Sequence, residues 1–348
     1  MTQKVRLVTV FLFLLGGAFV LTRPGRTQPQ QVKTAGEAFK NIQVLKDMPA
    51  DQLGKVMNIM SASLGVSCSG CHVSNEGDFE KDDNHHKIVA RKMIAMTFDL
   101  NRRYFDGRTE VSCNTCHRGS EHPVSVPALD RAPRTERPPQ PKEPPTVAAI
   151  LARYAKALGR SGKSVAGTTR VIKAERVEPD GRTREPETVI QSPGKLRVET
   201  HYGDLLVTEA FDGTTAVKTS GGSAIKLKPD EAEQIKREAQ LFAEPHLSSV
   251  YSKLEYRYLD RVDGKGAYLV IGTLADGSRE RLYFDAASGL LMRRVASTPT
   301  VLGAFQFQVD YMNYRPFGGV QLPTSVRFAM PGITWTREIK DVKFKKEG

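Results

Sequence analysis

Two copies of one five-residue pattern constrain this chain of 348 residues more than any other feature. Each copy has the form C-x-x-C-H, and together they use all four cysteines: Cys68-Ser-Gly-Cys71-His72 and Cys113-Asn-Thr-Cys116-His117. This spacing is the attachment signature of c-type haem. Two thiols three positions apart can each add to one vinyl group of the same porphyrin, and the next histidine can then ligate the iron. The pattern therefore predicts two covalently attached c-type haems, one on each motif.

Two other chemistries use C-x-x-C pairs. Two such pairs can hold a structural zinc ion, but a zinc site leaves the histidine after each second cysteine unexplained. Disulfide exchange places the pair at a helix start in a βαβ context, and the flanking sequence here is helical without strands. Haem attachment accounts for more of the pattern than either alternative.

A helix with two methionines precedes each motif. The first helix is expected from Ala50 to Leu64, before Gly65, and the second from about His85 to Tyr104. A low-spin haem needs a second axial ligand, which is commonly methionine or histidine. Spacing by three and four residues places both methionines of each helix on its apolar, and therefore buried, face. The candidates are Met57 or Met60 for one iron and Met93 or Met96 for the other, with His85 and His86 as alternatives.

The N-terminus has the pattern of an export signal. Arg6 precedes an apolar run over residues 7–21, which is just shorter than the roughly 17–25 residues of a membrane-spanning helix. Residues 1–31 are therefore expected to form a signal peptide or an N-terminal membrane anchor. Either would place the rest of the chain in the periplasm or on the outer face of the cytoplasmic membrane.

The remainder divides into three segments, which predict an α+β multidomain fold. Residues 32–121 hold every cysteine and are expected to form a small all-α dihaem domain. Residues 122–146 contain eight prolines and should form a semi-rigid linker. In residues 147–348, strand-like runs are separated by Asp-Gly pairs, which favour hairpins. The helices Val147–Leu158 and Pro229–Leu241 accompany them, so this segment should form an antiparallel, half-barrel-like β domain.

Charge and motif content exclude several function classes. The formal net charge of +12 is spread along the chain, and residues 32–121 are neutral overall, so no basic stripe indicates a nucleic-acid groove. Residues 147–348 show no nucleophile–base set, no glycine-rich phosphate loop and no metal-ligand cluster in the sequence. We therefore assign no catalytic residues and expect an electron carrier rather than an enzyme.

The region of residues 38–120 resembles half of the tetrahaem cytochrome c subunit of photosynthetic reaction centres. The resemblance rests on Asn41-Ile-Gln-Val-Leu, Ala90-Arg-Lys-Met93-Ile-Ala-Met96-Thr97, and the two motifs with the flanks Val111-Ser and Arg118-Gly. In that family each haem takes a methionine from the helix before its motif, which implies Met57 for the first iron and Met93 for the second. The resemblance implies single-electron transfer with redox-protein partners, including a membrane electron-transfer complex.

The C-terminal segment is weakly similar to the lipoprotein-sorting carrier family of exported proteins. The stretches that carry this similarity are Phe211-Asp-Gly-Thr-Thr-Ala-Val, Tyr283-Phe-Asp-Ala-Ala-Ser-Gly-Leu-Leu and Gly319-Val-Gln-Leu-Pro323. It implies lipid or quinol contact through this domain. Two alternatives to a plain electron carrier stay open. One is a dihaem peroxidase-type enzyme in which one iron keeps an open position, and the other is a lipid- or quinol-binding carrier with accessory haems.

Overall fold

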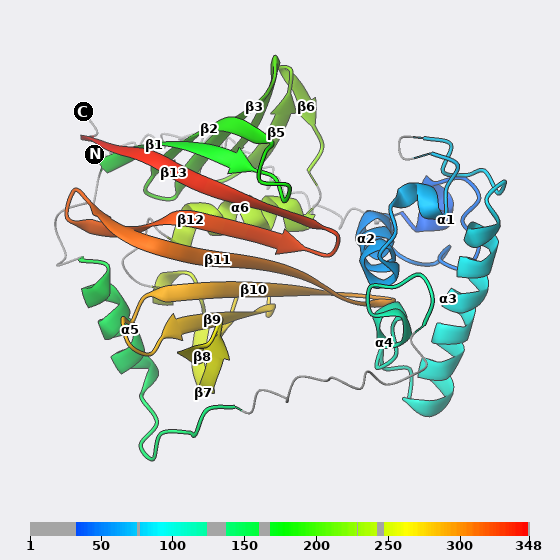
Figure 1. The fold of residues 1–348 in the computed structure, drawn as a ribbon, viewed down its shortest axis with the longest axis horizontal. Helices are drawn as coiled ribbons and strands as arrows, with labels where there is room; N and C mark the ends of the chain where they lie inside the picture. The colour runs from blue at the N-terminus through cyan, green and yellow to red at the C-terminus, as the bar shows by residue number, and fades with distance from the viewer. Residues whose placement is uncertain are drawn as a thin grey trace, which may run out of the picture.

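The computed structural model describes residues 33–74, 77–123, 137–159, 168–227, 229–241 and 247–346. A helical N-terminal region lies beside a large antiparallel sheet that two helices accompany, so the α+β multidomain prediction is confirmed (Figure 1). The expected export signal, residues 1–31, lies outside the described residues. Among the helices of the described residues, none is both long and apolar enough to span a membrane.

Among the described residues, the N-terminal region consists of two long helices and four short helical segments joined by loops. The two helices predicted before the motifs are confirmed, although Ala50–Gln52 forms a 3₁₀ turn ahead of the first α-helix. Gly65 ends that helix in the left-handed conformation, with φ of 69°. The elements are α1 (Ala35–Ala38), η1 (Ala50–Gln52), α2 (Leu53–Leu64), η2 (Cys68–Gly70), α3 (His85–Tyr104) and α4 (Cys113–His117).

The two long helices bury different kinds of face. Helix α2 packs the predicted stripe, which includes Val56 and Met57, into a small hydrophobic cluster. Helix α3 instead buries Ile94, Thr97 and Asn101. The prediction that Met93 and Met96 lie on a buried face of α3 is therefore wrong. The reason is that α3 has two faces that could pack. The face with Ile94, Thr97 and Asn101 packs inward, and the face with the methionines is exposed.

The C-terminal region is a single 13-stranded sheet in the order β6-β5-β4-β3-β2-β1-β13-β12-β11-β10-β9-β8-β7. The first and last strands of the region pair with each other, so two meanders join into one sheet. The strands are β1 (Thr168–Val177), β2 (Arg184–Ser192), β3 (Lys195–Tyr202), β4 (Leu205–Phe211), β5 (Ala216–Ser220), β6 (Ser223–Ile225), β7 (Lys253–Val262), β8 (Lys265–Thr273), β9 (Arg279–Asp285), β10 (Leu291–Thr300), β11 (Gly303–Phe317), β12 (Val320–Met330) and β13 (Ile333–Lys346).

Each predicted Asp-Gly pair lies in a turn between neighbouring antiparallel strands. The pairs at 180–181, 212–213, 263–264 and 276–277 join β1 to β2, β4 to β5, β7 to β8 and β8 to β9. All four glycines have positive φ, which costs glycine little because it has no Cβ atom. The hairpin signal in the sequence therefore specified these turns.

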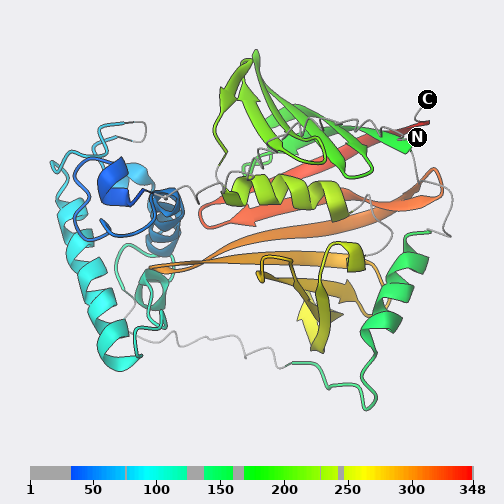
Figure 2. The same ribbon diagram turned by 180° about the vertical axis from the view of Figure 1, so that it is seen from behind.

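Two α-helices and the 3₁₀ turn η3 (Leu247–Ser249) accompany the sheet in the described part of this region. Helix α5 (Val147–Ala157) packs its buried Ile150 and Tyr154 against the core, and α6 (Pro229–Leu241) lies across the sheet (Figure 2). After α5 the chain turns at Gly159, where φ is 74° and an added Cβ would lie 2.6 Å from the Gly319 carbonyl oxygen. Position 159 therefore requires glycine, because the chain there passes close to the turn between β11 and β12.

The described part of the predicted linker runs along the edge strand β7. The Gln140 side chain donates to the Leu259 carbonyl at 2.8 Å and accepts from the Leu259 N–H at 2.7 Å. The Arg137 guanidinium lies 4.0 Å from the centre of the Tyr258 ring. These contacts attach residues 137–140 to the sheet. The boundaries at 31, 121 and 146 remain predictions from the sequence.

Candidate haem site and the cavity beside it

The first motif forms a single tight turn. Residues Cys68–Gly70 are 3₁₀, and the N–H groups of Cys71 and His72 both donate to the Cys68 carbonyl, at 3.2 and 2.9 Å. Side chains three apart eclipse each other in a 3₁₀ turn, so the two thiols lie on one side. Gly70 is needed within the turn, because an added Cβ would lie 2.9 Å from Cβ of Val66.

The second motif is the five-residue helix α4. Ser112 and Thr115 form a capping box at its start, and Arg118 ends it in the left-handed conformation with φ of 53°. Positions i and i+3 share a helical face, which again brings the two thiols together. The next N–H, of Gly119, donates to the Ser63 carbonyl at 2.7 Å, and so the second motif is attached to the end of α2.

Each motif histidine has surroundings suited to ligating a metal. The Nδ1 atom of His117 lies 3.0 Å from the Ser120 carbonyl oxygen, which leaves Nε2 for a metal. The His72 ring packs edge-on against Phe79, with 5.1 Å between ring centres. Burial, followed by the positive charge of Lys87, lowers the pKa of His72, which favours the neutral imidazole that binds metals.

The four cysteines are free thiols. Burial raises the pKa of Cys71, with a further contribution from Glu121, and burial also raises the pKa of Cys113. A disulfide-exchange site needs the opposite, a lowered thiol pKa. Within the described ranges, no group of three or more His, Cys, Asp or Glu side chains is placed to hold a metal ion. The thiols thus form two separate pairs, each followed by its own histidine.

The four candidate methionines lie in two different environments. Met57 and Met60 are partly buried in the cluster around α2. Met93 and Met96 are 40% and 45% exposed, and Val89 beside them is 37% exposed. A row of exposed apolar side chains on one helix is a surface that commonly meets an apolar partner. A porphyrin is a flat apolar group of this kind, so the thiol pairs, their histidines and this exposed surface are consistent with haem c binding.

The two alternative histidine ligands lie at the start of α3 and are exposed. His86 Nδ1 is 3.1 Å from the carbonyl oxygen of Gly70, between the two cysteines of the first motif. The Asn84 amide donates to the same oxygen at 3.3 Å. The start of α3 therefore packs on the first motif.

Asn101 was not identified from the sequence, yet it holds the loop before the second motif. It is 5% exposed. Its amide donates to the Val111 carbonyl at 2.7 Å, and its oxygen accepts from the N–H groups of Glu110 and Val111 at 3.1 and 2.8 Å. The sequence could have indicated this role, because Asn101 lies at helical spacing from Ile94 and Thr97, on the face of α3 that packs inward.

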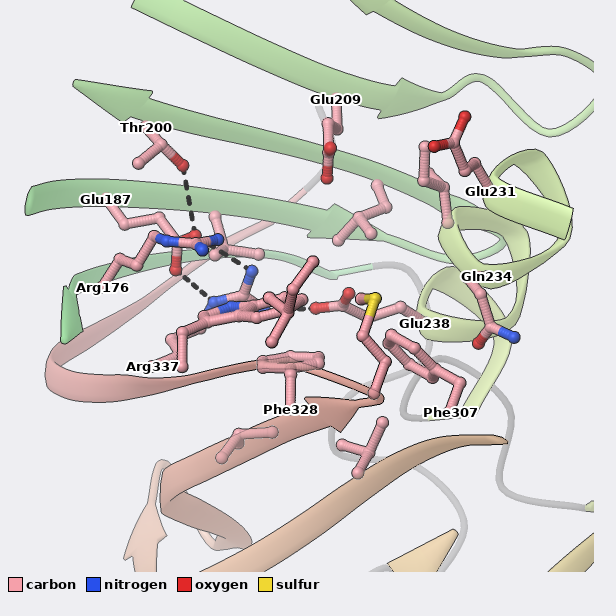
Figure 3. A pocket seen from close by; sticks show the side chains of 18 of the residues that line it. Arg176, Glu187, Thr200, Glu209, Glu231, Gln234, Glu238, Phe307, Phe328 and Arg337 are labelled. Atoms are coloured by element: carbon pink, nitrogen blue, oxygen red, sulfur yellow. Dashed lines mark hydrogen bonds and ion pairs between the residues drawn. The ribbon is translucent and has the colours of Figure 1, made fainter. Parts of the chain in front are cut away.

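A cavity of about 620 Å³ lies between the sheet and α6 (Figure 3). Its wall combines apolar side chains, such as Phe307 and Phe328, with six basic and four acidic residues. Helix α2 of the N-terminal region also contributes to the wall. The residues from α2 are Gly54, Lys55 and Asn58.

The cavity wall contains a buried charge network. Arg337 of β13 binds Glu187 of β2 and Glu238 of α6, with 3.1 Å between its Nη2 and Oε1 of Glu187. Burial lowers the pKa of Arg337, but the two carboxylates outweigh it and the net direction is upward. The guanidinium therefore remains charged and ties the two meanders to α6.

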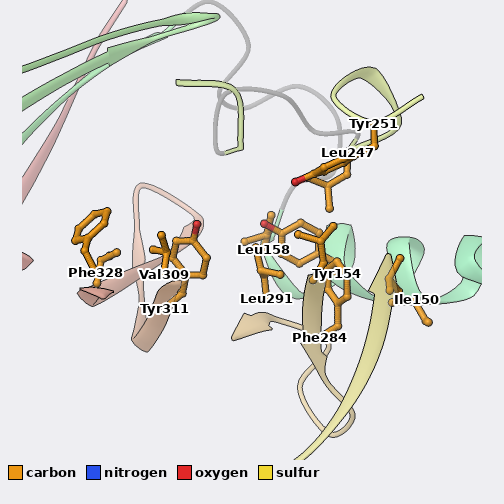
Figure 4. Close-up of a cluster of buried hydrophobic side chains, with 13 residues drawn as sticks. Ile150, Tyr154, Leu158, Leu247, Tyr251, Phe284, Leu291, Val309, Tyr311 and Phe328 are labelled. Carbon is orange, nitrogen blue, oxygen red and sulfur yellow. The ribbon is translucent and has the colours of Figure 1, made fainter. Parts of the chain in front are cut away.

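One side of the same sheet face is filled rather than open. Side chains from α5, including Tyr154, meet Phe284 and Leu291 in the largest hydrophobic cluster of the described residues (Figure 4). Val309 and Phe328 belong both to this cluster and to the cavity wall. The cavity is thus the part of the sheet face that this core does not reach.

The N-terminal region thus holds two C-x-x-C pairs on helical turns, which are consistent with haem c binding. Residues 18–152 match the family model described as photosynthetic reaction centre cytochrome C subunit. The resemblance predicted for residues 38–120 is confirmed.

Curated relatives share this region. The photosynthetic reaction center cytochrome c subunit of Roseobacter denitrificans is 36% identical over 103 residues, which are 26% of this chain and 27% of the relative. That of Thermochromatium tepidum is 32% identical, covering 29% and 25%. Cytochrome c-554 of Chloroflexus aurantiacus is 34% identical, covering 23% and 20%. The chain thus spans about a quarter of the length of the curated relatives it matches.

Solved structures resemble the C-terminal region. A LolA superfamily protein from Nitrosomonas europaea has a TM-score of 0.43 and 13% identity, covering 58% of this chain and 95% of that one. An outer membrane lipoprotein-sorting protein domain from Vibrio parahaemolyticus has a TM-score of 0.39 and 10% identity, covering 56% and 91%.

The three hydrogen bonds of Asn101 hold the loop before the second motif, and this role can be tested by substitution. Asn101→Ala leaves two N–H groups and one carbonyl without their partner, which should destabilise the N-terminal region by about 1–3 kcal/mol. Amide exchange at Val111 should therefore speed up. Asn101→Asp is the matched control, because it retains the acceptor for both N–H groups. Equal exchange at Val111 in the wild type and the alanine variant would contradict the anchoring role.

Proposed function

We propose that this chain is a dihaem c-type cytochrome that transfers single electrons in the cell envelope. The observation that supports this most is the repeated geometry of the two motifs. Each is one helical turn with paired free thiols on one side, followed at once by a histidine. Homology to reaction-centre cytochrome c subunits supports the same function, and family members are typically electron carriers rather than enzymes.

The residues of this chain would divide the work as follows. Cys68 and Cys71 would hold the first haem and Cys113 and Cys116 the second, with His72 and His117 as the axial ligands from the motifs. Met57 would ligate the first iron and Met93 the second. The chemistry supplied by a bound haem is the reversible uptake of one electron at iron. The surrounding protein sets the reduction potential through ligand type, burial and nearby charge.

The proposed location follows from the N-terminal sequence. Export through the signal in residues 1–31 would place the chain in the periplasm or on the outer face of the cytoplasmic membrane, with or without an uncleaved anchor. The partners proposed there are redox proteins, including a membrane electron-transfer complex.

Haem content tests the proposal directly. The exported protein should carry two haems that survive denaturing electrophoresis. Cys68→Ala or Cys113→Ala should lower the haem stain, and replacement of all four cysteines should abolish it, because the thioether bonds are then lost. Haem that is extracted without breaking covalent bonds would contradict the assignment. A high-spin signal would favour the peroxidase-type alternative.

The methionine ligands are tested by paired substitutions. Met57→His and Met93→His should each remove the methionine-to-iron absorption of one haem and lower its potential, since methionine ligation raises it. Met60→Leu and Met96→Leu nearly conserve volume, so they should leave the spectra intact and cost less than about 1.5 kcal/mol. If Met60→Leu or Met96→Leu removes the absorption and the neighbouring substitution does not, the iron ligand is the methionine one helical turn further along. No effect from all four would favour His85 or His86.

The cavity favours a second function, the binding of a lipid or quinol by the C-terminal domain. A volume of about 620 Å³ lies in the range of small-molecule sites. The apolar side chains of the wall suit a hydrocarbon chain. In this function the haems would serve or report on the bound molecule.

Oleate, which has a carboxylate and a long apolar chain, is a suitable probe for the cavity. Ala296 lines the cavity, so Ala296→Trp should fill part of it and weaken oleate binding at least tenfold in equilibrium dialysis. Ala329→Trp is the control, because Ala329 does not line the cavity and its neighbours Phe328 and Met330 do. Equal binding by both variants would contradict binding in the cavity. A short-chain quinone in parallel distinguishes the two ligand classes.

A further inference from the structure

The β10–β11 hairpin extends beyond the sheet that contains it. Strand β10 pairs with β9 only as far as Ala296, and β11 pairs with β12 only from Gln308 onward. Between these limits the two strands pair only with each other, up to Thr300 and Gly303. Four residues of β10 and five of β11 therefore project, which at about 3.4 Å per residue is roughly 14–17 Å.

The projecting tip has a defined shape. The Thr300 hydroxyl donates to the Gly303 carbonyl at 2.6 Å and accepts from the Leu302 N–H at 3.3 Å. Thr300 is 8% exposed. At Gly303, φ is 131°, and an added Cβ would lie 3.6 Å from Cβ of Ser112, the residue that caps α4. The tip therefore reaches the start of the second motif.

The side chain at the tip is buried in the other region. Leu302 is fully buried and belongs to the same hydrophobic cluster as Val56 of α2 and Ile94 of α3. Met57 and Cys113 pack against this cluster as well. Leu302 thus lies in the core shared by the helix that carries a candidate iron ligand and the motif that carries the second pair of thiols. Figures 1 and 2 both show the hairpin reaching α2 and α4.

We infer that the β10–β11 hairpin is a structural part of the N-terminal region and that Leu302 is a positioning residue for α2 and α4. The buried apolar side chains of that region are few, so one leucine supplied from the sheet is a large part of its core. The redox consequence of this inference rests on the proposed function. The packing consequence does not.

The test uses the full-length protein with three variants. Leu302→Ala leaves a cavity between α2 and α4, so amide exchange in both helices should speed up at least tenfold. The methionine-to-iron absorption should also weaken, and at least one reduction potential should fall. Leu302→Met nearly conserves volume and should restore both properties. Leu282→Ala is the matched control, because Leu282 is also fully buried but lies in the core of the sheet. It should speed exchange in the sheet and leave α2, α4 and both potentials unchanged.

Two results would overturn the inference. In the first, Leu302→Ala leaves exchange in α2 and α4 at the wild-type rate. In the second, Leu302→Ala and Leu282→Ala change α2 and α4 equally, which would indicate general destabilisation. A wild-type protein without haem would contradict the proposed function instead, and the exchange measurement would still decide the role of Leu302.

Discussion

The pairing of β1 with β13 is the interaction on which the C-terminal half of the molecule depends. Strands from opposite ends of that region lie side by side over Thr168–Val177 and Thr336–Lys346, and each carries one meander with it. The two meanders then share one face, on which the core, the cavity and α6 all lie. The Arg337–Glu187 contact crosses this junction inside the cavity wall, so the charge network depends on the same pairing. The β10–β11 hairpin lies between β12 and β9 in that sheet, and its tip packs on the N-terminal region.

What could be predicted from the sequence is what short-range chemistry determines. Gly65 and the helical spacing before it located α2, and the Asp-Gly pairs located four hairpin turns, because the signals lie within a few residues of the structure they specify. The two motifs were recognisable for the same reason, since thiol and imidazole positions in C-x-x-C-H are set within one helical turn.

What could not be predicted depends on residues far apart in the chain. Periodicity predicted a buried face for Met93 and Met96, but which face of an amphipathic helix packs inward depends on its neighbours. In α3 the neighbours include Leu302, which comes from the other end of the sequence. Asn101 was missed because its three hydrogen bonds follow from the course of a loop. The contribution of α2 to the cavity wall requires the relative placement of the two regions, which no local pattern encodes.

The contact between Gln140 and Leu259 has a consequence for behaviour at high concentration. A long edge strand offers unpaired backbone groups that can join the sheet of a second molecule and begin aggregation. One edge of this sheet is β6, which is only three residues long. The other edge is β7, a ten-residue strand, and there a side-chain amide occupies both backbone groups of Leu259. Residues 137–140 thus cover part of the longer edge, where a foreign strand would otherwise pair with Leu259.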